Sequence, residues 1–329
     1  MAIQPSPSRT SRGISVVDPV APALERVKQM LFRPFDLAKW ITIGFCAWLA
    51  GLGESGGGGN FNFGNYGGGG GGGAKPAEEF RHFYREASNF VLTNLFWIVP
   101  VAVLIILIVV AIWLLVLWVS SRGKFMFLHC VALDKAEVAE PWKKYADAAN
   151  SLFRFRIGLG LIGLVVILPL LVLIGLAVMR MVLRGEPDVA GILMTVALAF
   201  AFLIAVMVIT IIRKFTMDFV VPIQYLRGGR CLGAWGEFFN LLAANPWEFV
   251  LYILFQIVLT MAIGTLVVLV VLVTCCIAGC LMLLPFIGTV LLLPLLVFSR
   301  AYSLYYLAQF GHDVFLVPTV EQPAPPPIP

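Results

Sequence analysis

The chain has 329 residues, of which 60% are hydrophobic and only 12% are charged, and its mean hydropathy is +0.95. This balance excludes an ordinary water-soluble domain and predicts an integral membrane protein with no nucleic-acid partner. The formal net charge of +5 matters through its placement, because Lys and Arg residues of membrane proteins concentrate in cytoplasmic loops.

The two ends of the chain differ from its apolar middle. Residues 1–21 lack the apolar core and the small-residue cleavage site of a secretory signal, so we expect a disordered cytoplasmic arm. Residues 316–329 are rich in proline and are expected to form an extended cytoplasmic tail. Residues 22–315 remain for one membrane domain.

Hydropathy predicts six membrane spans within this domain, since each crossing needs about 20 apolar residues. The first is the weakest, because its apolar run is short. No backbone polar group is left unpaired in lipid, so these runs must be helices and the fold class is all-α, a polytopic membrane helical bundle. Pro100, Pro169 and Pro294 lie within spans and are expected to kink them. The predicted spans are residues 36–53, 92–120, 157–182, 189–213, 247–273 and 278–300.

The placement of positive charge predicts the orientation. An even number of spans puts both termini in one compartment, and that side collects 18 of the 23 Lys and Arg residues, which leaves 5 on the other side. We therefore expect both termini in the cytoplasm. The residues on the outer side are Lys75, Arg81, Arg85, Arg180 and Arg184.

The chain repeats one pattern three times. Spans two, four and six each end on an arginine that begins an apolar, aromatic-rich decamer. The three apolar decamers are RGKFMFLHCV from Arg122, RKFTMDFVVP from Arg213 and RAYSLYYLAQ from Arg300. Three amphipathic segments precede spans one, three and five: ALERVKQMLFRPFDLAKW, PWKKYADAANSLFRFRIG and AWGEFFNLLAANPWEFVL. This self-similarity predicts six transmembrane helices arranged as three repeats of an interfacial amphipathic helix plus a helical hairpin.

The amphipathic segments are expected to lie in the headgroup plane of the bilayer; the first has an apolar side and basic residues elsewhere, and the other two carry aromatic anchors. Trp142, Trp235 and Trp247 are predicted interfacial anchors, since amphipathic rings prefer this depth. Binding of a membrane-protein partner is the alternative role for these segments.

Arg122, Arg213 and Arg300 are the candidate site residues, and two interpretations stay open. In the first, they snorkel to cytoplasmic phosphates and stop each helix from sliding. In the second, the amphipathic segments cover the decamers and the arginines face a shared cytoplasm-side pocket for an anionic lipid headgroup. Asp218 is expected to pair with Lys214, four residues before it on the same helix.

The loop at residues 54–77 is rich in glycine and is expected to be a flexible extracytoplasmic tether. The letters GESGG around Ser55 match G-x-S-x-G, and the G-x-S-G of rhomboid proteases, which also have six spans. A nucleophilic serine needs a base held within hydrogen-bond reach, and His82 lies in the same loop with nothing to hold it there. A hydrolase acting through Ser55 is therefore a remote alternative.

Three cysteines, Cys275, Cys276 and Cys280, fall at the predicted outer turn between spans five and six. An oxidising compartment permits a disulfide from Cys280 to either of the other two, and small apolar packing residues are the alternative. No histidine or carboxylate converges there, so we expect no metal site and no cofactor.

The stretch MLFRPFDLAKWITIGFCAWLAGLGE, followed by a glycine-rich loop, and the later NPWEF resemble uncharacterised bacterial families of repeated six-span membrane proteins. These are similar in build to the membrane domain found beside glycerophosphodiester phosphodiesterase domains. The resemblance covers about residues 22–315 and implies a bacterial inner or plasma membrane location with an accessory or lipid-proximal role. It carries over no catalytic residue.

The leading hypothesis for function is a non-enzymatic membrane protein that handles or senses lipid, or assists an envelope complex. Its expected partners are the bilayer, an anionic lipid, and another membrane protein or a second copy of the chain. A transporter or channel is the alternative, although the spans show no continuous polar path and no acid or base at their centres.

Overall fold

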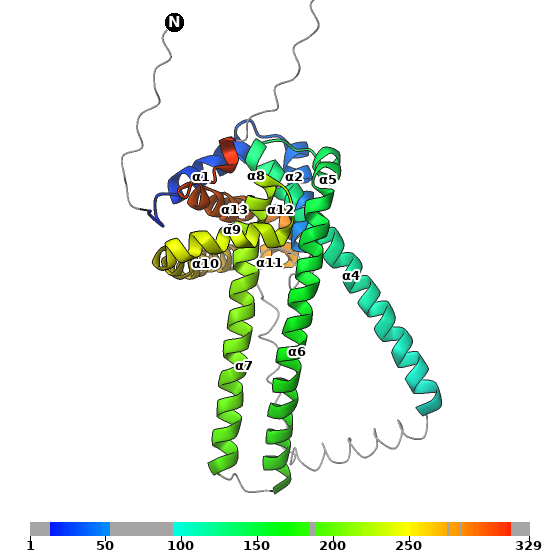
Figure 1. Ribbon diagram of the computed structural model, residues 1–329. Coiled ribbons are helices and arrows are strands. Elements are labelled where there is room, and N and C mark those ends of the chain that lie inside the picture. Colours follow the sequence, from blue (N-terminus) through cyan, green and yellow to red (C-terminus); the bar gives the residue numbers. More distant parts are fainter. Residues whose placement is uncertain (1–13, 53–94, 185–188, 275–276, 283, 317–329) are drawn as a thin grey trace, which may run out of the picture.

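The computed structural model describes residues 14–52, 95–184, 189–274, 277–282 and 284–316. Within these ranges the secondary structure is helical, as the sequence predicts. A compact group of shorter helices forms one end of the molecule, and the long helices α4, α6 and α7 project from it (Figure 1). The helices are α1 (Val20–Val27), α2 (Leu37–Gly51), α4 (Leu95–Leu133), α5 (Ala139–Lys144), α6 (Ala146–Arg184), α7 (Val189–Phe215), α8 (Val221–Arg227), α9 (Cys231–Ala244), α10 (Pro246–Val273), α11 (Ile277–Met282), α12 (Pro285–Leu291) and α13 (Leu293–Ala308), with π-helical turns η1 (Lys28–Phe32) and η2 (Thr216–Val220) and a 3-10 turn η3 (Val314–Leu316).

Four of the described helical stretches are long and apolar enough to cross a membrane: Phe96–Leu133, Ala146–Met181, Val189–Arg227 and Pro246–Val273. At most 11% of the most apolar window of each is buried inside the protein. An apolar surface of this extent is stable only against lipid or another apolar surface. By length and composition, the chain is therefore a membrane protein.

The first and sixth predicted spans differ from the expectation of six membrane-length helices. The first is α2, which has only 15 residues. The sixth, predicted over residues 278–300, is not one helix but the successive pieces α11, α12 and α13. Pro285 lies at the start of α12 and Pro294 at the start of α13. Proline lacks the N–H that would continue a preceding helix, so it breaks the segment at both points.

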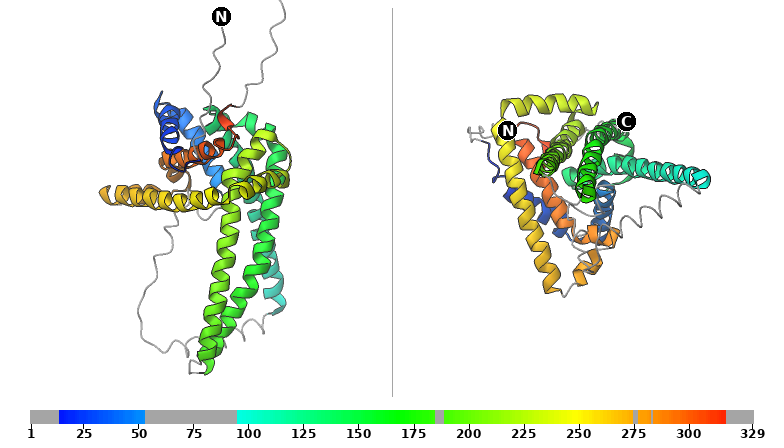
Figure 2. Two further views of the ribbon diagram at one scale, coloured as in Figure 1. Left: turned by 60° about the vertical axis from the view of Figure 1, so that its left-hand side comes forward. Right: turned by 90° about the horizontal axis from the view of Figure 1, so that it is seen from below.

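The direction of α10 is a second difference. The helices α6 and α7 run side by side as a hairpin, whereas α10 runs across their direction (Figures 1 and 2). Only the part of α10 near Phe249, Tyr252 and Gln256, together with Val267, is buried. Ile253, Phe255 and Leu259 are half-buried against the same core, whereas most apolar side chains from Ile257 to Val273 are exposed.

The three apolar decamers form the core of the compact end. In α4, every residue from Gly123 to Ala132 is buried. The second decamer continues α7 through η2 into α8, and the third lies in α13; most of their side chains are also buried. The decamer helices contact one another in all three pairs, α4 with α8, α4 with α13, and α13 with η2. Together the decamers carry seven Phe and Tyr side chains, so their burial contributes a large apolar term.

The amphipathic segments cover this core from outside. The first covers the decamer in α13 through α1, and just before it in the chain the Val16 carbonyl oxygen accepts a hydrogen bond from the Tyr302 hydroxyl at 2.8 Å. The second covers the decamer in α4, where Tyr145 stacks on Phe125 with ring centroids 6.1 Å apart. The third, α9, covers η2 and α8, and Phe238 stacks on Phe219 at 5.3 Å. Each decamer is thus covered by the amphipathic segment that follows it, and the last by the first.

A close helix contact tests this packing. A Cβ atom on Gly123 would lie 2.6 Å from backbone atoms of Leu49 and Ala50, so α2 and α4 approach this closely only with glycine. We expect Gly123→Ala to lower the free energy of unfolding by about 1–3 kcal/mol, measured by reversible unfolding in detergent.

The matched control is Gly236→Ala in α9, where an added Cβ meets nothing within 4 Å. This change should raise the free energy of unfolding by about 0.5–1 kcal/mol, because alanine has less conformational freedom to lose in a helix. Equal stability of the two variants would contradict the described contact between α2 and α4.

Candidate functional site

An open groove of about 390 Å³ lies between α4, α6 and α7, and we call it the arginine groove. At one end it is lined by Arg156, Arg213 and Thr216, and from there its wall is apolar. Gly160 and Gly163 form part of the α6 wall, and a Cβ on them would face Trp113 at 3.8 Å and Ile209 at 3.5 Å. The apolar lining also includes Leu117, Leu159, Leu164, Ile167, Leu168 and Leu171.

Arg156 is the most firmly positioned cation of the groove. It is only 8% exposed. One of its terminal nitrogens donates to the Oγ atoms of Ser120 and Ser121, at 3.2 Å each. The two serine hydroxyls in turn donate to the carbonyl oxygens of Ala50 and Leu117. This chain of hydrogen bonds fixes the guanidinium between α6 and α4.

Arg213 lies at the end of α7 and is exposed on the rim of the groove. It makes no hydrogen bond or ion pair to the described part of the chain, so its five N–H groups remain available. Arg213 is the one candidate arginine from the sequence that lines this groove.

The other two candidate arginines lie elsewhere. Arg300 donates from Nη1 to the carbonyl oxygen of Met217, a residue on the rim of the groove. Arg122 lies between two indole rings, with its guanidinium carbon 4.5 Å from the Trp118 ring and 4.9 Å from the Trp142 ring. These contacts occupy the Arg122 guanidinium within the protein. Arg213 and Arg156 therefore line the same groove, whereas Arg122 and Arg300 are held by protein groups.

The three predicted anchors have different surroundings. Trp247 is 74% exposed, as an anchor requires. Trp142 is half-buried and packs edge-on against Trp118. Trp235 is only 7% exposed and packs against Phe155 and Phe238, so it belongs to the protein core instead of the lipid interface. Its position on the inner side of α9 explains this difference.

A buried polar network lies beside the groove. Lys214 Nζ is 2.9 Å from Asp218 Oδ2, which confirms the predicted pair. The same oxygen accepts a hydrogen bond from the Tyr252 hydroxyl at 2.8 Å, and Gln256 Nε2 donates to that hydroxyl at 3.0 Å. The network joins η2 to α10 and orders the turn that follows Arg213.

Sequence reasoning missed several of these groups. Arg156 belongs to the RFRIG that ends the second amphipathic segment, and the apolar span directly after it was the available signal. Tyr252 and Gln256 are polar residues inside a predicted span. Cys46 of α2 and Cys130 of α4 lie 84 residues apart in the chain, and their sulfur atoms are 3.9 Å apart in the core. Sequence patterns did not predict the contacts between segments, because the residues that make them lie far apart in the chain.

Some predicted features lie outside the described residues. These are the glycine-rich loop, with Ser55 and His82, and the Cys275 and Cys276 pair; the side chain of Cys280 is likewise not described. Within the described ranges, no group of three His, Cys, Asp or Glu side chains is placed to hold a metal ion.

Comparison with known proteins places the chain in a family. The chain belongs to the family of unknown function DUF7544, whose model matches residues 14–317. No curated protein and no solved structure matches it. The likeness to the membrane domain found beside glycerophosphodiester phosphodiesterases therefore stays a prediction.

The polar network beside the groove gives a stability prediction. Asp218→Asn removes the negative charge that faces Lys214 and weakens the hydrogen bond from Tyr252. We expect the free energy of unfolding to fall by about 1.5–3 kcal/mol, the usual range for a hydrogen bond to a charged group. The exposed Asp18, whose side chain makes no described contact, gives the control Asp18→Asn, with a change of at most about 0.5 kcal/mol. Equal effects of the two changes would show that the network does not stabilise the fold.

Proposed function

We propose that this member of DUF7544 is a non-enzymatic membrane protein whose arginine groove binds an anionic phospholipid. The observation that carries the proposal is the groove itself, an apolar channel along α6 that ends at Arg156 and Arg213. A phospholipid has the same division, with acyl chains joined to a phosphate. Handling or sensing of such a lipid, or assistance to an envelope complex, is the role we assign to the protein.

The chemistry of the groove supports a phosphate at its polar end. Guanidinium groups present several N–H donors in a plane and form strong, charge-assisted hydrogen bonds to phosphate oxygens. No Asp or Glu residue is among the described lining of the groove, so nothing there opposes an anion. Thr216 adds a hydroxyl at the same end, although that hydroxyl donates to the Ile212 carbonyl oxygen.

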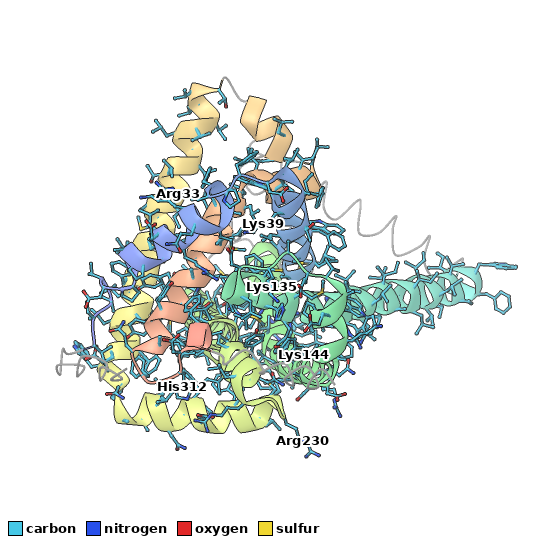
Figure 3. All side chains as sticks on the ribbon, turned by 90° about the horizontal axis from the view of Figure 1, so that it is seen from above. Arg33, Lys39, Lys135, Lys144, Arg230 and His312 are labelled. Atoms are coloured by element: carbon cyan, nitrogen blue, oxygen red, sulfur yellow. The ribbon has the colours of Figure 1, made fainter. Side chains whose placement is uncertain are left out.

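The distribution of charge supports binding from the cytoplasmic leaflet. Arg156 and Arg213 lie where α6 and α7 leave the compact end, and Arg33, Lys39, Lys135 and Lys144 are spread over that end (Figure 3). Basic residues concentrate on the cytoplasmic side, where anionic lipids also attract them. We therefore assign the compact end to the cytoplasmic face of a bacterial inner or plasma membrane, together with both termini.

The packing of the compact end supports three repeated units. Each unit comprises an amphipathic segment, a pair of apolar helices and a decamer, and the segments cover the decamers in cyclic order. We propose that each unit contributes two crossings, six in total. The helix α10 is the critical case, because it lies across α6 and α7 in the structure yet is apolar over 28 residues, as a spanning helix is.

The lipid proposal predicts how the removal of one positive charge changes the affinity for an anionic phospholipid. Arg213→Gln removes a cation from the groove, and because Arg213 is exposed the fold should not change. The loss of charge-assisted hydrogen bonds corresponds to about a tenfold drop in affinity for phosphatidylglycerol, measured by native mass spectrometry after titration of delipidated protein.

Arg180→Gln is the matched control for this experiment. Arg180 is also exposed and lies on α6, but at the far end from the groove. This variant should bind phosphatidylglycerol as the wild type does. If both variants bind equally well, or if neither they nor the wild type retain an anionic lipid, the arginine groove is not a phospholipid site.

The proposed topology is tested by labelling one introduced cysteine at a time in intact cells with a membrane-impermeant maleimide; the native Cys46, Cys130 and Cys231, which are buried, are left in place. Lys135→Cys should react only after permeabilisation, because it lies at the compact end. Thr274→Cys, which follows the last residue of α10, should react in intact cells if α10 crosses the membrane. Both changes are made in a background with Cys275, Cys276 and Cys280 replaced by serine. Labelling of Thr274→Cys only after permeabilisation would show that α10 lies along the inner surface.

A further inference from the structure

A second groove lies on the other side of α6, next to α9. Its volume is about 630 Å³, and we call it the α9 groove. Gly158, Ile162 and Leu232 give it an apolar wall, and Arg154 and Arg230 give it two cations. The role proposed above for the arginine groove does not use any of these five residues.

The two grooves share a wall. Phe155 and Leu159 line both of them, so these side chains form a ridge along α6 that separates the grooves. Arg154 and Arg156 stand on opposite sides of this ridge. Residues two apart on a helix point in nearly opposite directions, since each residue turns by about 100°. Arg154 and Arg156 therefore lie at nearly one level along α6, one on each side of the ridge.

The α9 groove is fixed and carries positive charge. The backbone N–H of Cys231 donates to Ser151 Oγ at 2.8 Å, which fastens the start of α9 to α6. Arg154 is exposed, and within the described part of the chain its one hydrogen bond runs from Nε to the Asn150 carbonyl oxygen at 3.4 Å. Arg230 is exposed, directly precedes α9 and projects from the edge of the molecule (Figure 3).

Nothing in the described lining of the α9 groove offsets these charges. It includes no Asp or Glu residue. Burial raises the pKa of the Cys231 thiol to about 12, so this thiol stays neutral at physiological pH and adds no negative charge. Each groove thus combines an apolar wall with two arginines, and the two polar ends adjoin.

We propose that the two grooves together bind one phospholipid that carries two phosphate groups. One phosphate lies at Arg156 and Arg213 and the other at Arg154 and Arg230, with acyl chains on both sides of the ridge of Phe155 and Leu159. The inference rests on the proposed function and names its ligand class. A lipid with two linked phosphates gains the second contact without a second loss of translational freedom, so it binds more tightly than a lipid with one.

The experiment compares two probes with the same acyl chains. Delipidated protein is titrated with dioleoyl phosphatidylglycerol, which has one phosphate, and with tetraoleoyl diphosphatidylglycerol, which has two. Native mass spectrometry gives the stoichiometry and the relative affinity of each. We expect one diphosphatidylglycerol per chain and a preference of at least about tenfold over the lipid with one phosphate.

Two double variants show which groove is responsible. Arg154→Gln with Arg230→Gln should abolish the preference and leave binding of phosphatidylglycerol at the arginine groove intact. The control, Arg33→Gln with Arg180→Gln, removes the same charge from exposed positions that line neither groove, and should keep the preference. All four arginines are exposed, and an unchanged melting temperature confirms that each variant is folded.

The possible failures are distinct. If the wild type binds both probes with equal affinity, or binds two phosphatidylglycerol molecules as tightly as one diphosphatidylglycerol, the inference is wrong while the proposed function stands. The same holds if the variant in the α9 groove keeps the preference. If the wild type binds neither probe, the proposed function itself fails.

Discussion

The burial of the three apolar decamers against one another is the constraint on which the rest of the structure depends. Each decamer continues or follows an apolar helix, yet it lies beyond the length that a bilayer covers. Water would make such a segment unstable, so the decamers pack together and the amphipathic segments cover them. Arg122 and Arg213 mark this boundary, because the helix before each exposes apolar side chains and the decamer after it is covered by protein; the residues directly before Arg300 are themselves buried or half-buried.

The grooves follow from this core. The helices α4, α6 and α7 are held together at the compact end, and below it α4 leans away from α6 (Figure 1). A wedge between diverging helices is widest where small residues line it, and Gly160 and Gly163 lie there. The cations at the top of the wedge are those that the core itself positions: Arg156 through two serines, and Arg213 through the turn that continues into the core. The arginine groove therefore combines apolar and cationic surface because the helices diverge below the core while the core holds the arginines at their upper ends.

The sequence predicted correctly those features that depend only on residues within one segment. Hydropathy predicted a helical membrane protein, and the pair of Lys214 and Asp218 needed only the spacing of one helix. It was uninformative about contacts between segments. Arg213 lines a groove together with Arg156, a residue from a different helix, and Trp235 turned inward onto a core that hydropathy does not locate. The direction of α10 was unpredictable for the same reason, since an apolar helix looks alike whether it runs beside α6 or across it.

The most direct test of the central claim is an electron cryomicroscopy map of the protein in nanodiscs of bacterial polar lipid. The account predicts density for a phospholipid along α6, with a phosphate between Arg156 and Arg213 and an acyl chain against Gly160 and Gly163. An arginine groove that is closed by protein side chains, or that holds only an uncharged detergent or lipid with no headgroup density at the arginines, would contradict it.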